Sequence, residues 1–342
     1  MRTAPAKYLF DQESELCAQF RKDGYVILQG IVDPELLDGV RSEIEEAFIL
    51  PPPENVPELG GIQPAIGRFQ DAWRLCPTVA KLASAPRVIR ALEELYGAQP
   101  HPFQTLTFSV GTQQLSHSDH IHFSSRPLGF MCGAWVALED VTDDNGPLFY
   151  YPGSSNLPYM DYVSLGIDVS KYDQEPQAYG EYEQMIDEFA QLNGYVKRTF
   201  TARKGDVLIW AANLIHGGSP VRSVGSSRWS QVTHYLFDDC VHYTPRLSDE
   251  VQGKWYVRKP IDVCTGLPIR SSATEEVVVD RQPSPTPEPL NEQLIDELKS
   301  QIDSLSTRVT NLRNELDSLR RTKIFRYTQP LRRIYGRLRR NR

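Results

Sequence analysis

The feature that most restricts the fold of this chain is a series of short apolar or alternating segments that begins near residue 100. Turn-forming stretches such as DDNG, KGD and HGGSP separate them. Strands of this length between such turns are typical of a β-sandwich or a jelly roll. We therefore predict a mainly β domain built from FQTLTFSV (103–110), FMCGAWVALEDV (130–141), GPLFYYPGS (146–154), DVLIWAANLI (206–215) and RWSQVTHYLF (228–237).

Helical patterns flank these strands. In residues 13–49 the spacing of apolar residues predicts a helix, then a short strand over 25–28, then a second helix. An insertion between Ser155 and Thr199 contains EYEQMIDEFAQL (181–192), which predicts an amphipathic helix. This helix is either a lid over a site or packing against the body of the domain.

Composition limits the class of protein. The five cysteines of this 342-residue chain never form a C-x-x-C pair, which argues against a disulfide framework or a zinc knuckle. The chain has no run of eighteen apolar residues and no apolar signal segment, so we expect a cytoplasmic protein. Residues 320–342 carry ten Arg or Lys and no acid, and removing them from the net charge of −7 leaves −17. An anionic partner is therefore expected at this basic end, although not nucleic acid, since no nucleic-acid-binding motif accompanies it.

The C-terminal part divides into three segments after a main domain over 1–268. Residues 269–291, rich in Pro, Ser and Glu, predict a disordered linker, and 324–342 form a basic tail. Between them, 292–323 predict a coiled coil that makes the protein a homo-oligomer. β-branched residues at a and Leu at d favour two parallel strands, but one pair of like charges would then face each other, so the strand number stays open. The apolar positions are Ile295, Leu298, Ile302, Leu305, Val309, Leu312, Leu316 and Leu319.

The stretch HSDHIHF (117–123) holds three of the seven histidines. On a strand, His117 and Asp119 would share a face, and His216, 97 residues after Asp119, could supply a third ligand at the end of an apolar strand. Two imidazoles and one carboxylate suit non-haem Fe(II) and leave three coordination positions open. An isolated H-x-D is a weak signal, but Arg228, at the start of the following strand, could bind a carboxylate in the same core.

Taken in order, these segments resemble the phytanoyl-CoA dioxygenase family of Fe(II)- and 2-oxoglutarate-dependent oxygenases. The resemblance covers residues 15–246 and is carried by FRKDGYVILQGIVDPELL, GTQQLSHSDHIHF, VALEDVTDDNGPLFYYPGS, KGDVLIWAANLIHGGSP and SRWSQVTHYLF. It implies a double-stranded β-helix, the jelly-roll or cupin-like fold. It also implies that the iron ligands are His117, Asp119 and His216.

The resemblance further implies that Arg228 binds the C5 carboxylate of 2-oxoglutarate. Arg222 is the rival, but it is expected in a turn rather than on the strand. Ser230 is expected to contact the same carboxylate, and Gln104 to line the cosubstrate pocket.

The remaining histidines receive other roles. His122 is expected near the pocket mouth, where it could contact substrate. His120 is expected to be either exposed or behind the ligands. The default expectation for His101, His234 and His242 is a structural role.

The reaction implied by the resemblance is hydroxylation with release of succinate and carbon dioxide. Asp119 supports this outcome, because related halogenases lack the carboxylate. The expected substrate is a small molecule, a sugar or a lipid-linked compound. The alternative is a non-catalytic member of the fold that binds a ligand or acts as a scaffold.

The C-terminus also resembles the tails of bacterial polysaccharide-biosynthesis enzymes, through Phe325, Arg326, Thr328, Pro330, Leu331 and Arg332. This resemblance implies docking on a glycan-assembly complex or on the inner face of an anionic membrane. The alternative is a solvated basic helix end.

Overall fold

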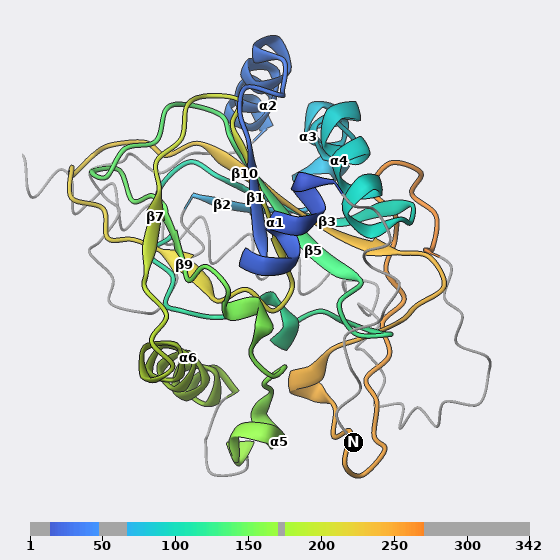
Figure 1. Ribbon diagram of the computed structural model, residues 1–342. Helices are drawn as coiled ribbons and strands as arrows, with labels where there is room; N and C mark the ends of the chain where they lie inside the picture. Colours follow the sequence, from blue (N-terminus) through green and yellow to red (C-terminus); the bar gives the residue numbers. More distant parts are fainter. Residues whose placement is uncertain (1–13, 48–66, 170–174, 270–342) are drawn as a thin grey trace, which may run out of the picture. The chain divides into compact units, whose positions relative to one another are not determined.

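A computed structural model of the chain describes residues 14–47, 67–169 and 175–269 (Figure 1). The predicted coiled coil, the basic tail and nearly all of the linker lie outside these residues. Over the described part of the chain, no helix is both long and apolar enough to span a bilayer.

The N-terminal elements agree with the sequence prediction. Helix α1 (Glu15–Asp23) is followed by β1 (Tyr25–Leu28) and α2 (Pro34–Ala47). The side chain of Ser14 caps α1 by accepting a hydrogen bond from the backbone of Cys17 at 3.2 Å. Gly24 ends the helix with φ +77, a conformation that favours glycine. The chain can therefore turn directly from α1 into β1.

Two antiparallel sheets form the body of the domain. The larger has the order β1-β8-β5-β10-β3-β2 and the smaller has the order β7-β6-β9. Neighbouring strands in each sheet are distant in sequence, as expected for a jelly roll. The remaining strands of the larger sheet are β2 (Arg68–Gln70), β3 (Pro100–Phe108), β5 (Met131–Ala137), β8 (Val207–Ala211) and β10 (Ser230–Phe237). The smaller sheet contains β6 (Leu148–Tyr150), β7 (Arg198–Phe200) and β9 (His216–Gly218), and a separate pair joins β4 (Ser124–Arg126) to β11 (Val241–Tyr243).

Both faces of the larger sheet are buried. On β8, Leu208 and Trp210 face the smaller sheet, whereas Val207 and Ile209 pack towards the N-terminal helices, as period-two alternation requires. These helices include α3 (Pro77–Ala83) and α4 (Pro86–Tyr96), which lie with α2 on one side of the strands in Figure 1. The predicted insertion helix is α6 (Glu175–Leu192), on the opposite side. It packs against the outer face of the smaller sheet around Phe149.

The local structure of the histidine-containing segments differs from the prediction. HSDHIHF is not a strand: His117 forms one isolated bridge, and Asp119–Ile121 is a 3-10 turn, η4. The apolar strand β8 ends at Ala211, and a turn closed by the Leu214 N–H and the Ala211 carbonyl moves the chain to the smaller sheet. His216 therefore begins β9 instead of ending β8. Short elements complete the described chain: η3 (Ala72–Arg74), η5 (Ser154–Asn156), α5 (Tyr162–Leu165) and η7 (Pro245–Leu247).

Candidate active site

Direct backbone pairing brings the two predicted histidine ligands together. The N–H of His117 donates to the carbonyl of His216, and the N–H of His216 donates to the carbonyl of His117, both at 2.9 Å. Side chains of directly opposed residues in an antiparallel pair lie on the same face. The two imidazole rings accordingly lie 4.5 Å apart between centroids.

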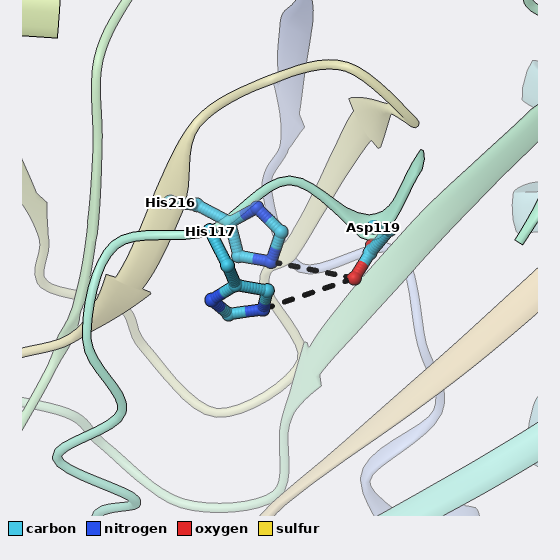
Figure 2. A group of neighbouring side chains, drawn as sticks. All are labelled: His117, Asp119 and His216. Atoms are coloured by element: carbon cyan, nitrogen blue, oxygen red, sulfur yellow. Dashed lines mark ion pairs between the residues drawn. The ribbon is translucent and has the colours of Figure 1, made fainter. Parts of the chain in front are cut away.

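The 3-10 turn then places Asp119 against both rings (Figure 2). Its Oδ1 lies 3.9 Å from Nε2 of His117 and 3.8 Å from Nε2 of His216. The ligand atoms of the three residues all lie within 4.8 Å of one another, and the three side chains are buried. The structure thus brings together the three residues predicted as metal ligands.

Hydrogen bonds to backbone carbonyls fix the orientation of both imidazoles. Nδ1 of His117 lies 2.9 Å from the carbonyl of Leu115, and Nδ1 of His216 lies 3.0 Å from the carbonyl of Leu214. Because a carbonyl oxygen only accepts, each Nδ1 carries the proton and donates it. Each Nε2 is therefore left with a lone pair directed towards Asp119, as a metal ligand requires.

The ionisation states of these residues also suit a divalent cation. Burial, reinforced by the neighbouring His216, lowers the pKa of His117 to about 3, so this imidazole is neutral at physiological pH. For Asp119, burial acts to raise the pKa, but the nearby His234 and His216 outweigh it and the net pKa is lowered. A neutral imidazole and an ionised carboxylate are the forms that bind metal without first losing a proton.

A buried cation shares a cavity with the three ligands. Arg228 is 1% exposed and lines this cavity together with His117, Asp119 and His216. Its Nη1 donates to Oγ of Ser230 at 2.8 Å, whereas Nε and Nη2 have no hydrogen-bond partner in the described part of the chain. Burial lowers the pKa of Arg228 to about 10. Buried N–H groups of a guanidinium that lack a partner indicate a site for an anion.

The residues fit iron and 2-oxoglutarate. Two imidazoles and one carboxylate form the donor set of non-haem Fe(II) oxygenases. Nε and Nη2 of Arg228, which lack partners among the described residues, match the distal carboxylate of a dicarboxylic acid. The walls between these ends are largely apolar and include Leu106, Phe108, Trp135, Leu148 and Val232.

The phytanoyl-CoA dioxygenase sequence model matches residues 20–229, which include the three candidate ligands and Arg228. The chain belongs to the phytanoyl-CoA dioxygenase family. The resemblance noted in the sequence is thereby confirmed, and with it the prediction of an Fe(II)- and 2-oxoglutarate-dependent oxygenase.

Two curated relatives carry the family's name. The "Phytanoyl-CoA dioxygenase domain-containing protein 1" of Danio rerio is 26% identical over 195 residues, which are 43% of this chain and 66% of the relative. The "Probable phytanoyl-CoA dioxygenase" of Caenorhabditis elegans is 23% identical over 250 residues, which are 66% of this chain and 75% of the relative. The matched regions leave out parts of both chains, so these likenesses apply to the oxygenase domain.

Solved structures confirm the jelly-roll fold. The non-heme alpha ketoglutarate dependent carbocyclase SnoK from nogalamycin biosynthesis has a TM-score of 0.53 at 18% identity, covering 76% of this chain and 94% of SnoK. EctD from S. alaskensis, crystallised with 2-oxoglutarate and 5-hydroxyectoine, has a TM-score of 0.51 at 19% identity, covering 82% of this chain and 94% of EctD. At these identities the likeness concerns the fold.

The structure separates the two arginines that competed for the cosubstrate role. Arg222 is exposed in the loop before β10 and does not line the cavity of this oxygenase. Arg228 lies two residues before β10, and its side chain lines the cavity. Ser230 contacts Arg228, as described above. Gln104 does not line the cavity, and its Oε1 instead lies 3.0 Å from Nδ1 of His234, which does.

Neither of the other histidines of the motif lines the cavity described above. His120 is 2% exposed and packs its ring edge-on against Tyr159, which excludes the exposed alternative. The 3-10 turn is the reason, because it rotates His120 into the core. His122 is half-buried, and its Nε2 lies 3.0 Å from the hydroxyl of Tyr179 on α6. His101 lies between Asp262 and Asp238, away from the cavity.

Sequence reasoning missed two residues that contact Asp119. The indole N–H of Trp210 donates to Oδ2 of Asp119 at 2.6 Å, and Nε2 of His234 lies 3.4 Å from the same oxygen. We expected His234 to have a structural role and assigned none to Trp210. Strand alternation could have placed both side chains on the inner face, but no local motif indicates that they meet at one carboxylate.

Proposed function

We propose that this protein hydroxylates a small organic molecule in a reaction that consumes 2-oxoglutarate and dioxygen and releases succinate and carbon dioxide. One observation carries the proposal. The buried group of His117, Asp119 and His216 shares a cavity with Arg228, whose Nε and Nη2 have no partner among the described residues. A metal site and an anion anchor in one cavity are the two parts that this chemistry needs.

Each side chain has a role in this proposal. His117 and His216 hold their protons at Nδ1 and present Nε2 to the metal, while Asp119 presents a carboxylate oxygen. Arg228 binds the distal carboxylate of 2-oxoglutarate through two parallel N–H groups, and Ser230 holds the guanidinium in place. Iron in this site supplies the activation of dioxygen. The apolar walls exclude water and strengthen the charge pairing at Arg228.

Binding and turnover test the proposal separately. Anaerobic addition of Fe(II) and then 2-oxoglutarate should produce a weak visible charge-transfer band that is absent from the His216→Ala variant. Succinate release should then be measured in air with nucleotide sugars, glycans and acyl thioesters. A protein that binds both cofactors but releases no succinate with any of these would support the non-catalytic alternative. Absence of the band would contradict the proposed site itself.

For the substrate, we propose a sugar or a lipid-linked compound as the finer class. Half-buried His122 is the proposed substrate contact, because its hydrogen bond with Tyr179 links the metal motif to α6. Replacing His122 by Phe should raise the KM for the accepted substrate while leaving 2-oxoglutarate affinity unchanged. Equal effects on both would assign His122 to the cosubstrate pocket instead.

The C-terminal assignments stay predictions, because they lie outside the described residues. They comprise the boundaries at 268, 291 and 323, homo-oligomerisation through the coiled coil, and cytoplasmic location with docking of the basic tail on a glycan-assembly complex or at the inner membrane face. Deleting residues 290–342 should reduce the oligomer to a monomer and abolish binding to anionic vesicles. Unchanged size and vesicle binding would contradict both assignments.

A further inference from the structure

One row of residues crosses the larger sheet directly beneath the metal ligands. Cross-strand pairing places Trp210 of β8 opposite Gly133 of β5, Gly133 opposite His234 of β10, and His234 opposite Gln104 of β3. The side chains of Trp210 and His234 both reach Asp119 from this row. Asp119 lies in the 3-10 turn η4, outside this sheet, and its carboxylate contacts the row from there.

The two oxygens of Asp119 have different surroundings. Oδ1 is nearly equidistant from Nε2 of His117 and Nε2 of His216, at 3.9 and 3.8 Å. Oδ2 accepts the buried hydrogen bond of Trp210 at 2.6 Å and lies 3.4 Å from Nε2 of His234. The geometry leaves Oδ1 as the oxygen that faces the metal site and Oδ2 as the oxygen that is held.

Gly133 makes this arrangement possible. A Cβ atom added there would lie 2.5 Å from two carbons of the Trp210 indole and 2.8 Å from its Nε1. The indole therefore occupies the space that any other residue at this position would fill. Its ring also packs against His216, with 4.7 Å between centroids, so Trp210 contacts two of the three candidate ligands.

We propose that Trp210, seated over Gly133, is a positioning residue that holds Oδ2 of Asp119 and thereby presents Oδ1 alone to the metal. The inference rests on the proposed function of the site. Its physical basis is coordination number: a carboxylate that binds through both oxygens takes one of the three positions that a bidentate 2-oxoglutarate and dioxygen need. When Oδ2 is held by the indole N–H, it cannot bind the metal as well. A hydrogen bond to the atom of a ligand that faces away from the metal also keeps that ligand oriented.

The test uses Mn(II) alone as the probe, so that it does not depend on catalysis. Trp210→Phe keeps an aromatic ring but removes the N–H, and we expect Mn(II) binding to weaken about 10- to 100-fold, the usual effect of losing such a partner. Gly133→Ala should also weaken Mn(II) binding, because the added methyl group displaces the indole. The Fe(II)–2-oxoglutarate charge-transfer band should shift in both variants, which loss of general stability would not cause.

Trp135→Phe is the matched control. Trp135 is also a buried tryptophan that lines the cavity, but its Nε1 has no hydrogen-bond partner in the described chain. Its Mn(II) affinity should stay within about twofold of the unaltered protein, a difference well below the tenfold that corresponds to about 1.4 kcal/mol.

The outcomes distinguish the inference from the proposed function. Unchanged Mn(II) affinity and an unshifted band in either Trp210→Phe or Gly133→Ala, with thermal unfolding showing a folded protein, would overturn the inference. Equal weakening in Trp135→Phe and Trp210→Phe would overturn it too, because loss of cavity packing would then be the cause. If the unaltered protein bound no Mn(II), the proposed function would fail first, and the inference with it.

Discussion

The two ends of the cavity differ in how completely their polar atoms are hydrogen-bonded. At the metal end, Nδ1 of both histidines and Oδ2 of Asp119 have partners, which leaves two Nε2 atoms and Oδ1 facing one another. At the anchor end, the guanidinium of Arg228 has a partner in the described chain at Nη1 but none at Nε or Nη2. The first end is orientated by the protein itself, and in the proposed function the second is completed by the carboxylate of 2-oxoglutarate.

This difference follows from what each ligand requires. A metal ion needs donor atoms held at fixed positions, so the atoms behind the donors must be bonded. An anion needs N–H groups that nothing else occupies, and each buried donor left unpaired costs about 1–3 kcal/mol of stability. In the proposed function, the anchor end therefore reduces the stability of the free protein in exchange for recognition of the cosubstrate.

Replacing His216 by Ala tests the metal end most severely. It removes one of three ligands, so binding of Fe(II) or Mn(II) and release of succinate should both be lost. Metal analysis of the purified variant and isothermal titration with Mn(II) measure this. Retained metal affinity would show that the ion binds elsewhere.

Replacing Arg228 by Met should affect the other end selectively. Loss of two charge-assisted hydrogen bonds costs about 3 kcal/mol, so 2-oxoglutarate should bind about 100-fold more weakly. Mn(II) affinity should be unchanged. The free energy of unfolding in the absence of ligand should stay equal or rise, because an incompletely paired buried charge is removed. Titration of the charge-transfer band and urea unfolding measure these effects, and a parallel loss of metal affinity would contradict the separation of the two ends.

Unfolding measured over a range of pH tests whether burial keeps His120, the neighbour of Asp119 in the chain, uncharged. Burial lowers the pKa of His120 to about 3, against about 6.5 in the unfolded chain. Between these values only the unfolded chain binds this proton. The contribution of His120 to the free energy of unfolding therefore falls as the pH drops below 6.5, by up to about 1.4 kcal/mol per pH unit. His120→Gln should therefore flatten the pH dependence of unfolding between pH 6.5 and 4.5.

His101 provides the control of opposite sign. Its hydrogen bond to Asp262 raises its pKa, so its contribution to stability is present at acidic pH and is lost as the pH rises through the raised pKa. The unaltered protein should exceed His101→Gln in stability by more at pH 5.5 than at pH 8.5. Equal slopes for the unaltered protein and His120→Gln would show that His120 is charged in the folded state.

The smallest effect is expected at Ser230. Its Oγ accepts the one hydrogen bond that the Arg228 guanidinium donates within the described part of the chain, and losing a bond of this kind costs about 1 kcal/mol. Ser230→Ala should therefore weaken 2-oxoglutarate binding about fivefold. Arg222→Ala is the control and should have no effect, because Arg222 is exposed outside the cavity. The reverse result would make Arg222 the anchor.

Much of the fold could be predicted because local patterns specify it. Helices α1 and α2 and the insertion helix follow the predicted helical spacing. Strands β5, β6, β8 and β10 lie within four of the five predicted segments, and β3 overlaps the fifth but begins three residues earlier, at Pro100. The prediction for HSDHIHF was wrong in its local structure, although the residues it selected do converge. The shared face of His117 and Asp119 was predicted from the alternation of side chains along a strand, whereas a 3-10 turn brings Asp119 to the histidines by another route.

The sequence by itself determined the donor types, since two histidines, one aspartate and a downstream arginine carry their chemistry wherever they lie. The structure decided which atoms remain free. The indole of Trp210 reaches Asp119 across Gly133, and Gln104 contacts His234 instead of the cavity. These contacts depend on the register between strands far apart in the chain, and a one-residue slip would reverse every side chain. No short stretch of sequence encodes such a register, because it is fixed only when the whole sheet forms.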